Sequence, residues 1–326
     1  MLIAAHRVNN TLKKEWRMPQ RVILVADDIE NKTDSGKRRS QAIRDAASFY
    51  AQKLKTGIDL LYVEDIKDYP ANKLGSFQFL EWHSTHEEKL QENGRQFTLP
   101  VSCSLKSGSP AEQILKVLVS KPSPEFVVMG TRGQKGVKRL LIGSVAEEVI
   151  RNSKRPVMVI GPTAQEMVRD ISRQKQHKIL VPTDLGKNSR AAEQYALSLA
   201  KRIGARVTLF HCLWDSINAT MVGTAHYGMA AFNINGIIDE SRDDALDFMK
   251  RKTSLFQNHG VPCDYKIEDE AITSMCAVYQ ECENGYSCVV MGTHGRNALL
   301  NAFFGSTARE TILNATIPVI VVHSNR

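Results

Sequence analysis

A glycine pattern that occurs twice constrains the fold of this chain more than any other feature. The segment MGTRGQKGVKRLLIGS begins at Met129, and the segment MGTHGRNALLNAFFGS begins at Met291. In both segments the glycines follow the spacing G-x2-G-x9-G, and a serine follows the last glycine. The nine residues before that last glycine share almost no chemistry, so the spacing itself is what repeats. The chain is therefore predicted to contain two copies of one fold.

The repeat extends well beyond the glycines. Each copy opens with an apolar run that ends in aspartate, RVILVADD from Arg21 and KILVPTD from Lys178. A helical pattern then follows a serine, and Ser40 and Ser189 are predicted to be helix N-caps. Apolar strand-length runs and helical patterns alternate up to PVMVIG and PVIVVH, which is typical of a parallel sheet covered on both faces. We predict an α/β fold of two tandem, doubly wound, mainly parallel five-stranded sheets flanked by helices.

The length of 326 residues suits two such domains. We place an N-terminal extension at 1–19, the first domain at 20–162, a partly helical linker at 163–176 and the second domain at 177–326. The first copy has seven extra residues between its strand-ending aspartate and its helix. The second copy has a stretch rich in small residues over 214–238, which suits a lid or an interface cover.

Composition narrows the class of protein. With 42% hydrophobic and 24% charged residues, the chain matches a soluble globular protein. It has no apolar run of the ~18 residues that cross a bilayer, and its opening segment does not fit a secretory signal, so we expect a cytoplasmic protein. The net charge of +8 lies within residues 1–162. Because these basic residues are scattered without interleaved aromatic residues, we expect a solvated face and no nucleic-acid partner.

Thiol and metal chemistry are not indicated. The six cysteines include no C-x-x-C pair, which favours reduced and mostly buried thiols over a zinc site. His83 and His86 lie three residues apart and could share a helix face, but no third ligand is in view. We interpret both histidines as surface polar residues.

The glycine segment has the features of a phosphate site. Gly130 and Gly292 end predicted strands at the carboxyl edge of the sheet, where open α/β sheets bind ligands. A residue without a side chain there lets the backbone approach an anion closely. Gly143 and Gly305 precede a helix, whose first amides and positive dipole end favour phosphate.

Part of the same pattern matches an ordinary helix start. Ser144 with Glu147, and Thr307 with Glu310, have the spacing of capping boxes. The sequence contains no G-x-x-x-x-G-K-[ST] P-loop, no G-x-G-x-x-G after the first strand and no G-x-S-x-G elbow. With two further glycines at fixed spacing, repeated twice, phosphate binding is the favoured interpretation.

With both glycine segments, ILVPTD and the two final strands, the chain resembles the universal stress protein family in its tandem-domain form. The G-x2-G-x9-G-[ST] pattern is that family's ATP-binding motif. The resemblance implies an adenine nucleotide α-hydrolase-like, Rossmann-like fold that binds ATP or a related adenine nucleotide, with Mg²⁺ or Mn²⁺ held through the phosphates. It also implies that the last strands, at 156–160 and 318–322, pair across the two halves, and it leaves a homodimer open.

The resemblance also assigns site residues by position. Asp28 and Asp184 would lie beside the adenine and ribose, and main-chain groups at Val63 and Cys212 would hold the adenine edge. The residues around the ribose and phosphates would be Gly130, Arg132, Gly133, Gly292, His294 and Gly295. Those that take the phosphates would be Gly143, Ser144, Gly305 and Ser306. Flanking positions that complete the predicted sites are Met129, Val145, Pro182, Thr183, Met291 and Thr307.

The two sites are not expected to be equal. VADD in the first copy departs from the Pro-Thr-Asp turn that the second copy keeps at 182–184, and this favours two sites of one kind but of different strength. We predict a nucleotide-binding stress-response regulatory or protective protein with no catalytic residue and at most slow ATP hydrolysis. Two alternatives stay open: a slow ATPase or nucleotide-dependent enzyme on the same scaffold, with His294 as the nearest catalytic candidate, and an interaction module with one degenerate site.

Overall fold

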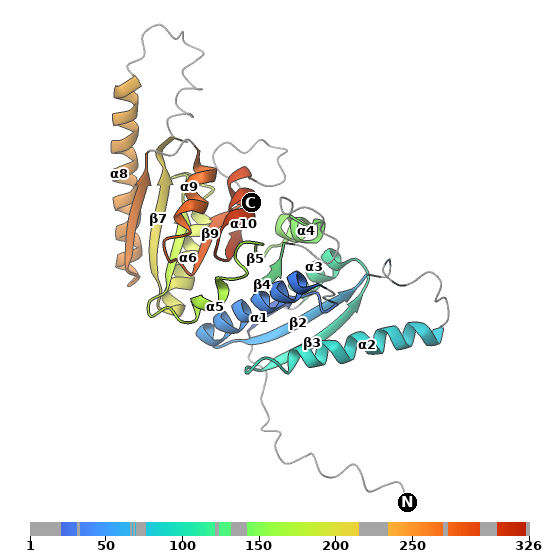
Figure 1. The fold of residues 1–326 in the computed structure, drawn as a ribbon. Coiled ribbons are helices and arrows are strands. Elements are labelled where there is room, and N and C mark those ends of the chain that lie inside the picture. Colours follow the sequence, from blue (N-terminus) through green and yellow to red (C-terminus); the bar gives the residue numbers. More distant parts are fainter. Residues whose placement is uncertain are drawn as a thin grey trace, which may run out of the picture.

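The computed structural model describes residues 21–30, 33–65, 67, 69, 76–120, 124–131, 142–214, 234–269, 273–293 and 305–323. Strands and helices alternate along the chain in both halves (Figure 1). The elements of the first half are β1 (Val22–Ala26), α1 (Asp34–Leu54), β2 (Gly57–Glu64), α2 (Ser76–Gly94), β3 (Val101–Ser107), α3 (Pro110–Ser120), β4 (Pro124–Gly130), α4 (Ser144–Asn152) and β5 (Val157–Ile160).

The elements of the second half repeat this order after a short linker helix. They are α5 (Val168–Ile171), β6 (Lys178–Pro182), α6 (Arg190–Ile203), β7 (Arg206–Cys212), α8 (Ile234–Asn258), β8 (Cys263–Glu268), α9 (Ser274–Glu281), β9 (Cys288–Gly292), α10 (Ser306–Asn314) and β10 (Val319–Val322). Helix α5 lies within the predicted linker at 163–176. Helix α8 begins inside the predicted long loop at 214–238. Residues 215–233 of that loop lie outside the described part of the chain, and so does the predicted N-terminal extension at 1–19.

The described strands form one ten-stranded sheet in the order β3-β2-β1-β4-β5-β10-β9-β6-β7-β8. Within each half the neighbouring strands run parallel. The halves meet at β5 and β10, which run antiparallel, with Val159 opposite Val319 and Met158 opposite Ile320. The predicted doubly wound α/β fold is confirmed, and its two five-stranded sheets are continuous with each other.

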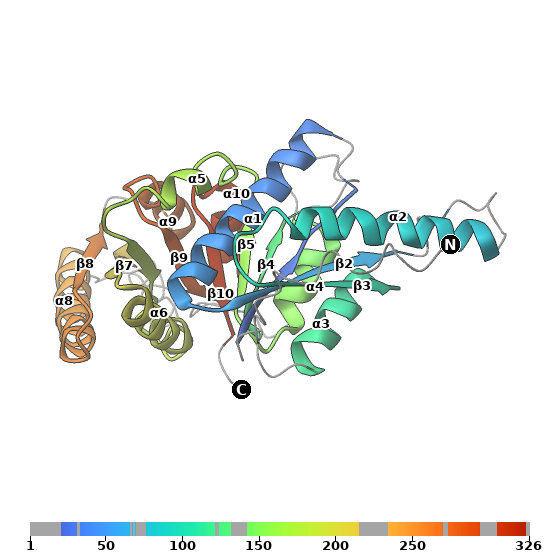
Figure 2. The same cartoon turned by 90° about the horizontal axis from the view of Figure 1, so that it is seen from below.

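Helices cover both faces of the sheet. Figure 2 shows α1 and α2 on one side of the first five strands, and α3 and α4 on the other. Buried apolar side chains form one cluster on each face. The first cluster includes Ile43 of α1 and Leu199 of α6, and the second includes Ile150 of α4 and Ile312 of α10. Because each cluster draws on both halves, burial of apolar surface stabilises the junction between them as well as each half.

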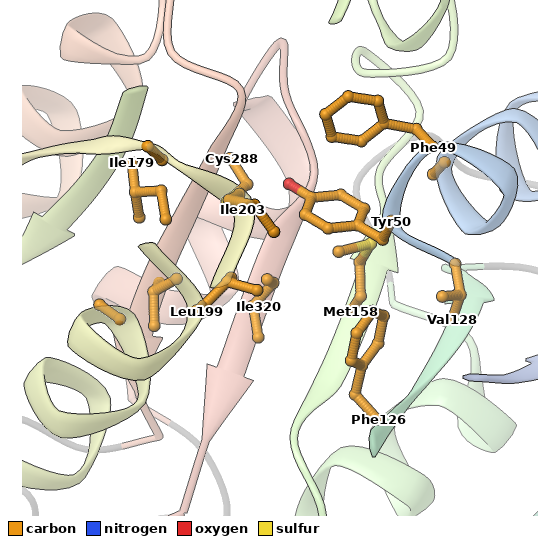
Figure 3. Packing of buried hydrophobic residues seen from close by; sticks show 14 of the residues in the cluster. Phe49, Tyr50, Phe126, Val128, Met158, Ile179, Leu199, Ile203, Cys288 and Ile320 are labelled. Carbon is orange, nitrogen blue, oxygen red and sulfur yellow. The ribbon is translucent and has the colours of Figure 1, made fainter. Parts of the chain in front are cut away.

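The junction is filled by large side chains (Figure 3). Tyr50 of α1 is fully buried, and its hydroxyl points across the junction toward Cys288 of β9. Met158 and Ile320, which are opposite each other on β5 and β10, are also fully buried. The junction between the halves is therefore part of the buried core.

Helix α1 begins earlier than the sequence pattern predicts. Its N-cap is Thr33, whose side chain accepts a hydrogen bond from the Gly36 amide at 3.1 Å. Ser40 lies inside the helix, so its predicted N-cap role is wrong, and most of the extra residues of this copy are helical. Ser189 stands at the N-cap position of α6 but makes no side-chain cap. Both serine hydroxyls instead bond to an aspartate on the turn after the strand, Ser40 to Asp27 and Ser189 to Asp184.

The described helices were compared with the length and hydrophobicity that a membrane-spanning helix needs. Within this part of the chain, none of them combines enough length with enough apolar character to cross a bilayer.

Candidate functional site

The predicted site residues gather at the carboxyl edge of the sheet in each half. Strands β1 and β4 are neighbours, but the chain leaves β1 toward β2 and leaves β4 toward β5. Strands β6 and β9 make the same switch in the second half. Such switch points are where open α/β sheets bind ligands. Asp28 and Gly130 stand at the first switch point, and Asp184 and Gly292 stand at the second.

A main-chain hydrogen bond closes each glycine segment. The Gly143 amide donates to the Thr131 carbonyl at 2.6 Å, and the Gly305 amide donates to the Thr293 carbonyl at 2.8 Å. The chain therefore returns to the end of β4 or β9 before the next helix begins. In this way the start of α4 or α10 is held against the strand edge.

Four predicted residues lie within these closed segments. Arg132, Gly133, His294 and Gly295 fall outside the described residues, so their roles stay predictions.

Glycine is the N-cap of the helix that follows each segment. Gly143 and Gly305 have extended backbone, and neither helix start has a side-chain cap. Ser144 is the first helical residue and Thr307 the second, so the two predicted capping boxes are wrong. The first amides of α4 and α10 are the groups that a helix cannot satisfy internally, and without a side-chain cap they favour an anionic ligand.

An ion pair fixes the turn after β1. Arg44 Nη1 donates to Asp27 Oδ2 at 2.8 Å, and Ser40 Oγ donates to Asp27 Oδ1 at 2.6 Å. Burial raises the pKa of the Asp27 carboxyl, and the Arg44 guanidinium opposes that rise. The adjacent Asp28 accepts a hydrogen bond from the Glu30 amide at 3.0 Å. The departure VADD thus holds the turn by an ion pair and keeps Asp28 at the strand edge.

The turn after β6 is held by a different network. Thr183 Oγ1 donates to Glu193 Oε1 at 2.7 Å, and the Lys252 ammonium donates to the other oxygen of that carboxylate. Ser189 Oγ donates to Asp184 Oδ1 at 2.5 Å. Asp184 Oδ2 is buried and has no hydrogen-bond partner among the described residues. A buried acceptor without a partner is costly, so this oxygen fits a ligand donor such as a ribose hydroxyl or an adenine amine.

The two turns occupy equivalent places. The Asp27 amide donates to the Leu61 carbonyl at 3.2 Å, and the Thr183 amide donates to the Phe210 carbonyl at 2.8 Å. Two residues further along, Val63 and Cys212 therefore correspond, and the side chains of both are buried. Counting along the chain from the serine that follows each turn leads to the same correspondence.

The remaining predicted positions border the same edges. Met129 and Met291 are buried next to the strand ends, and Pro182 ends β6. Val145 follows Ser144 in the first turn of α4, and Ser306 begins α10.

Sequence reasoning missed a buried polar cluster beside the first site. Glu64, the last residue of β2, is fully buried, and its carboxylate lies 2.9 Å from His83 Nδ1, 2.8 Å from His86 Nδ1 and 3.0 Å from Ser107 Oγ. The second ring nitrogen of His86 lies 3.1 Å from Glu30 Oε1. His86 is only 1% exposed, so its interpretation as a surface residue is wrong. The spacing of the histidines showed a shared helix face but not the buried carboxylate opposite it.

The prediction that most cysteines are buried is confirmed. Cys212, Cys263, Cys282 and Cys288 are buried, Cys103 is half-buried and Cys276 is exposed. Among the described residues, no three His, Cys, Asp or Glu side chains are arranged to hold a metal ion.

Comparison with known proteins identifies relatives of both halves. The sequence model of the universal stress protein family matches twice, over residues 20–161 and 176–323. A universal stress protein of Methanocaldococcus jannaschii is 25% identical over 167 residues, which are 49% of this chain and 92% of that protein. A universal stress protein of Mycobacterium bovis is 24% identical over 249 residues, which are 72% of this chain and 78% of that protein.

A solved structure extends the likeness to the whole fold. The crystal structure of a universal stress protein from Archaeoglobus fulgidus superposes with a TM-score of 0.62 at 18% identity, and the match covers 94% of this chain and 97% of that one. At this identity the likeness concerns the fold alone, and the two matches of the family model carry the assignment. The chain belongs to the universal stress protein family and contains two of its domains in tandem.

Proposed function

We propose that this protein binds ATP or a related adenine nucleotide at the carboxyl edge of each half and acts as a stress-response regulatory or protective protein. The principal support is the closed glycine segment. In both halves a main-chain hydrogen bond holds a helix start without a side-chain cap against a strand edge. Helix amides and the helix dipole favour phosphate at such a position. Membership in the family and the intact glycine spacing support the same ligand.

The adenosine part of the ligand would lie toward the turns after β1 and β6. There Asp28 and Asp184 would act as acceptors, and main-chain groups at Val63 and Cys212 would hold the adenine edge. In the second half the most direct support is Asp184 Oδ2, which is buried and has no hydrogen-bond partner in the part of the chain that the structure describes. Mg²⁺ or Mn²⁺ would bind through the nucleotide phosphates, since these hard cations commonly combine one or two protein ligands with phosphate oxygens and water.

We further propose that the protein is a binder and that any ATP hydrolysis is slow. The alternative, a slow ATPase or nucleotide-dependent enzyme, needs a base near the phosphates, and His294 is its nearest candidate. A cytoplasmic location and a homodimer stay predictions of the same proposal.

Native mass spectrometry of the purified chain, followed by calorimetric titration with ATP and Mg²⁺, tests the proposal. We expect adenine nucleotide to co-purify with the chain and two binding events of unequal affinity to follow after its removal. Gly133→Ala and Gly295→Ala are each expected to remove one event, because a side chain there would hinder approach of the phosphates. GTP serves as the control ligand. A chain that carries no nucleotide and releases no heat with ATP would contradict the proposal.

An assay of phosphate release separates the binder from the enzyme. We expect turnover of about one per minute or slower, whereas typical enzymes turn over about 1 to 10³ times per second. Faster turnover that His294→Ala abolishes would support the enzyme alternative instead.

A further inference from the structure

The extension of α1 brings an arginine to the first site that has no counterpart in the second. Helix α1 begins at Asp34, six residues before Ser40, whereas α6 begins at Arg190, directly after the matching serine. The residue before Ser40 is Arg39, and the residue before Ser189 is Asn188. The two halves therefore differ by a full positive charge at this position.

The Arg39 side chain lies on the first glycine of the glycine segment. A Cβ built on Gly130 would be 2.9 Å from Arg39 Cδ and 3.2 Å from Arg39 Cγ. The aliphatic part of the arginine thus covers the Gly130 backbone at the end of β4. Arg39 is 8% exposed, whereas its neighbours Lys37 and Arg38 on the same helix are exposed. The absence of a side chain at Gly130 is what makes room for this contact.

A buried guanidinium requires acceptors, because it stays charged at all physiological pH values. The two carboxylates on the turn after β1 already have partners: Asp27 is bonded by Ser40 and Arg44, and Asp28 accepts from the Glu30 amide. Arg39 already takes part in an interaction within the chain, and with five donors a guanidinium can keep one partner and also donate to a phosphate. Its guanidinium carbon is only two bonds beyond the Cδ that contacts Gly130, one of the glycines expected around the ribose and phosphates.

We propose that Arg39 binds the nucleotide phosphates in the first site and gives this site a stronger preference for ATP over adenosine than the second site has. This inference rests on the proposed function, since it presupposes that the first half binds an adenine nucleotide. The phosphate would lie between Arg39 on one side and the first amides of α4 on the other. Arginine suits this role because its planar fork of donors matches phosphate oxygens.

The test uses the full chain carrying Gly295→Ala, so that the first site is observed alone. Affinities for ATP with Mg²⁺ and for adenosine are measured by calorimetry for this chain, for Arg39→Met and for Arg38→Met. Methionine keeps the apolar stem over Gly130 and removes only the charged fork. Arg38→Met removes the same charge one residue away at an exposed position, and thermal melting checks that each variant is folded.

We expect Arg39→Met to weaken ATP binding by about 10- to 100-fold, the range of a lost charge-assisted hydrogen bond, and to leave adenosine binding unchanged. Arg38→Met should change ATP binding by less than about threefold, since an exposed charge contributes little. Equal ATP affinities in the two variants would overturn the inference. A matching loss of ATP and adenosine in Arg39→Met would overturn it as well, because the arginine would then only support the fold.

The converse substitution tests the inference in the second half. In a chain carrying Gly133→Ala, Asn188→Arg should strengthen ATP binding and leave adenosine binding unchanged. If the unmodified chain binds no adenine nucleotide, the proposed function itself fails, and the inference fails with it. If the chain binds ATP and Arg39→Met does not alter the affinity, only the inference fails.

Discussion

The Arg44 guanidinium lies 2.8 Å from the Asp27 carboxylate, at the place where the second half has Glu193 bonded to Thr183. The two copies thus hold the same turn through helix side chains of opposite charge, Arg44 in the first and Glu193 in the second. In the first copy a base on α1 meets an acid on the turn. In the second an acid on α6 meets a hydroxyl, and Lys252 of α8 supplies the balancing charge. The turn position is kept because each network leaves the following aspartate at the edge of the sheet.

Arg44→Met is expected to destabilise the protein by about 3 to 5 kcal/mol, because it leaves the buried Asp27 carboxylate without its counter-charge. Urea unfolding measures this loss. The double variant Asp27→Asn with Arg44→Met should cost less than Arg44→Met alone, since it leaves no buried unpaired charge. A double variant as unstable as the single one would show that the charge is not the cause.

The cost of Arg44→Met is also expected to depend on pH. Burial raises the pKa of Asp27 above its ordinary value of 3.8, and loss of Arg44 should raise it further. A carboxyl whose folded pKa is raised contributes stability that is present below the unfolded pKa and is lost as pH rises through the folded pKa. The variant should therefore be closest to the wild type in acidic buffer and furthest from it near neutral pH. Unfolding curves across this range check the trend.

His86→Ala is expected to destabilise the protein by about 3 kcal/mol and to loosen α2, because Glu64 would lose a buried partner. Hydrogen exchange of the α2 amides reports the loosening, and urea unfolding reports the free energy. His83→Ala is the matched control, since the His83 side chain is 39% exposed although it contacts the same carboxylate, and it should cost less than about 1 kcal/mol. Equal effects of the two substitutions would argue against a special role for the buried imidazole.

Met158 and Ile320 are expected to be energetically coupled across the junction of the two halves. They lie opposite each other on β5 and β10, and both are fully buried. A double-mutant cycle with Met158→Ala and Ile320→Ala should give a coupling of about 0.5 to 3 kcal/mol. The pair Ile23→Ala and Ile320→Ala, on strands that are not neighbours, serves as the control and should be additive. A coupling near zero for the first pair would mean that the halves behave as independent units.

His177 is expected to make the junction sensitive to acid. Its ring contacts the Phe49 ring of α1 edge-on, with 4.8 Å between centroids. Burial lowers the pKa of His177 from its ordinary value of 6.5, and Lys53 lowers it further. As pH falls below 6.5, the unfolded chain therefore takes up a proton at His177 more readily than the folded chain does, and stability declines.

His177→Phe keeps a ring against Phe49 and removes the titrating group. Its stability should fall less steeply than that of the wild type between neutral and mildly acidic pH. Thermal melting over this range measures both slopes. Parallel slopes would assign the acid sensitivity to other groups.

The fold followed from local patterns. Apolar strand runs, helical periodicity and two sets of glycines at fixed spacing are properties of neighbouring residues, and they predicted the doubly wound α/β halves and the strand edges that hold Asp28, Gly130, Asp184 and Gly292. The predictions were wrong where a side chain could bond either to a neighbour in sequence or to a residue further away. Ser40 has the residue type of an N-cap, but its hydroxyl bonds to Asp27 instead.

The sequence by itself determined the duplication, the α/β class and the glycine spacing at the strand edges, because spacing and periodicity depend only on residues that are close in sequence. Only the tertiary structure decided that His86 is buried against Glu64, that Arg39 covers Gly130 and that Asp184 keeps a buried oxygen without a partner among the described residues. Each of these depends on which segments pack side by side. Burial and pairing of polar groups are set by contacts between distant residues, which no local pattern records.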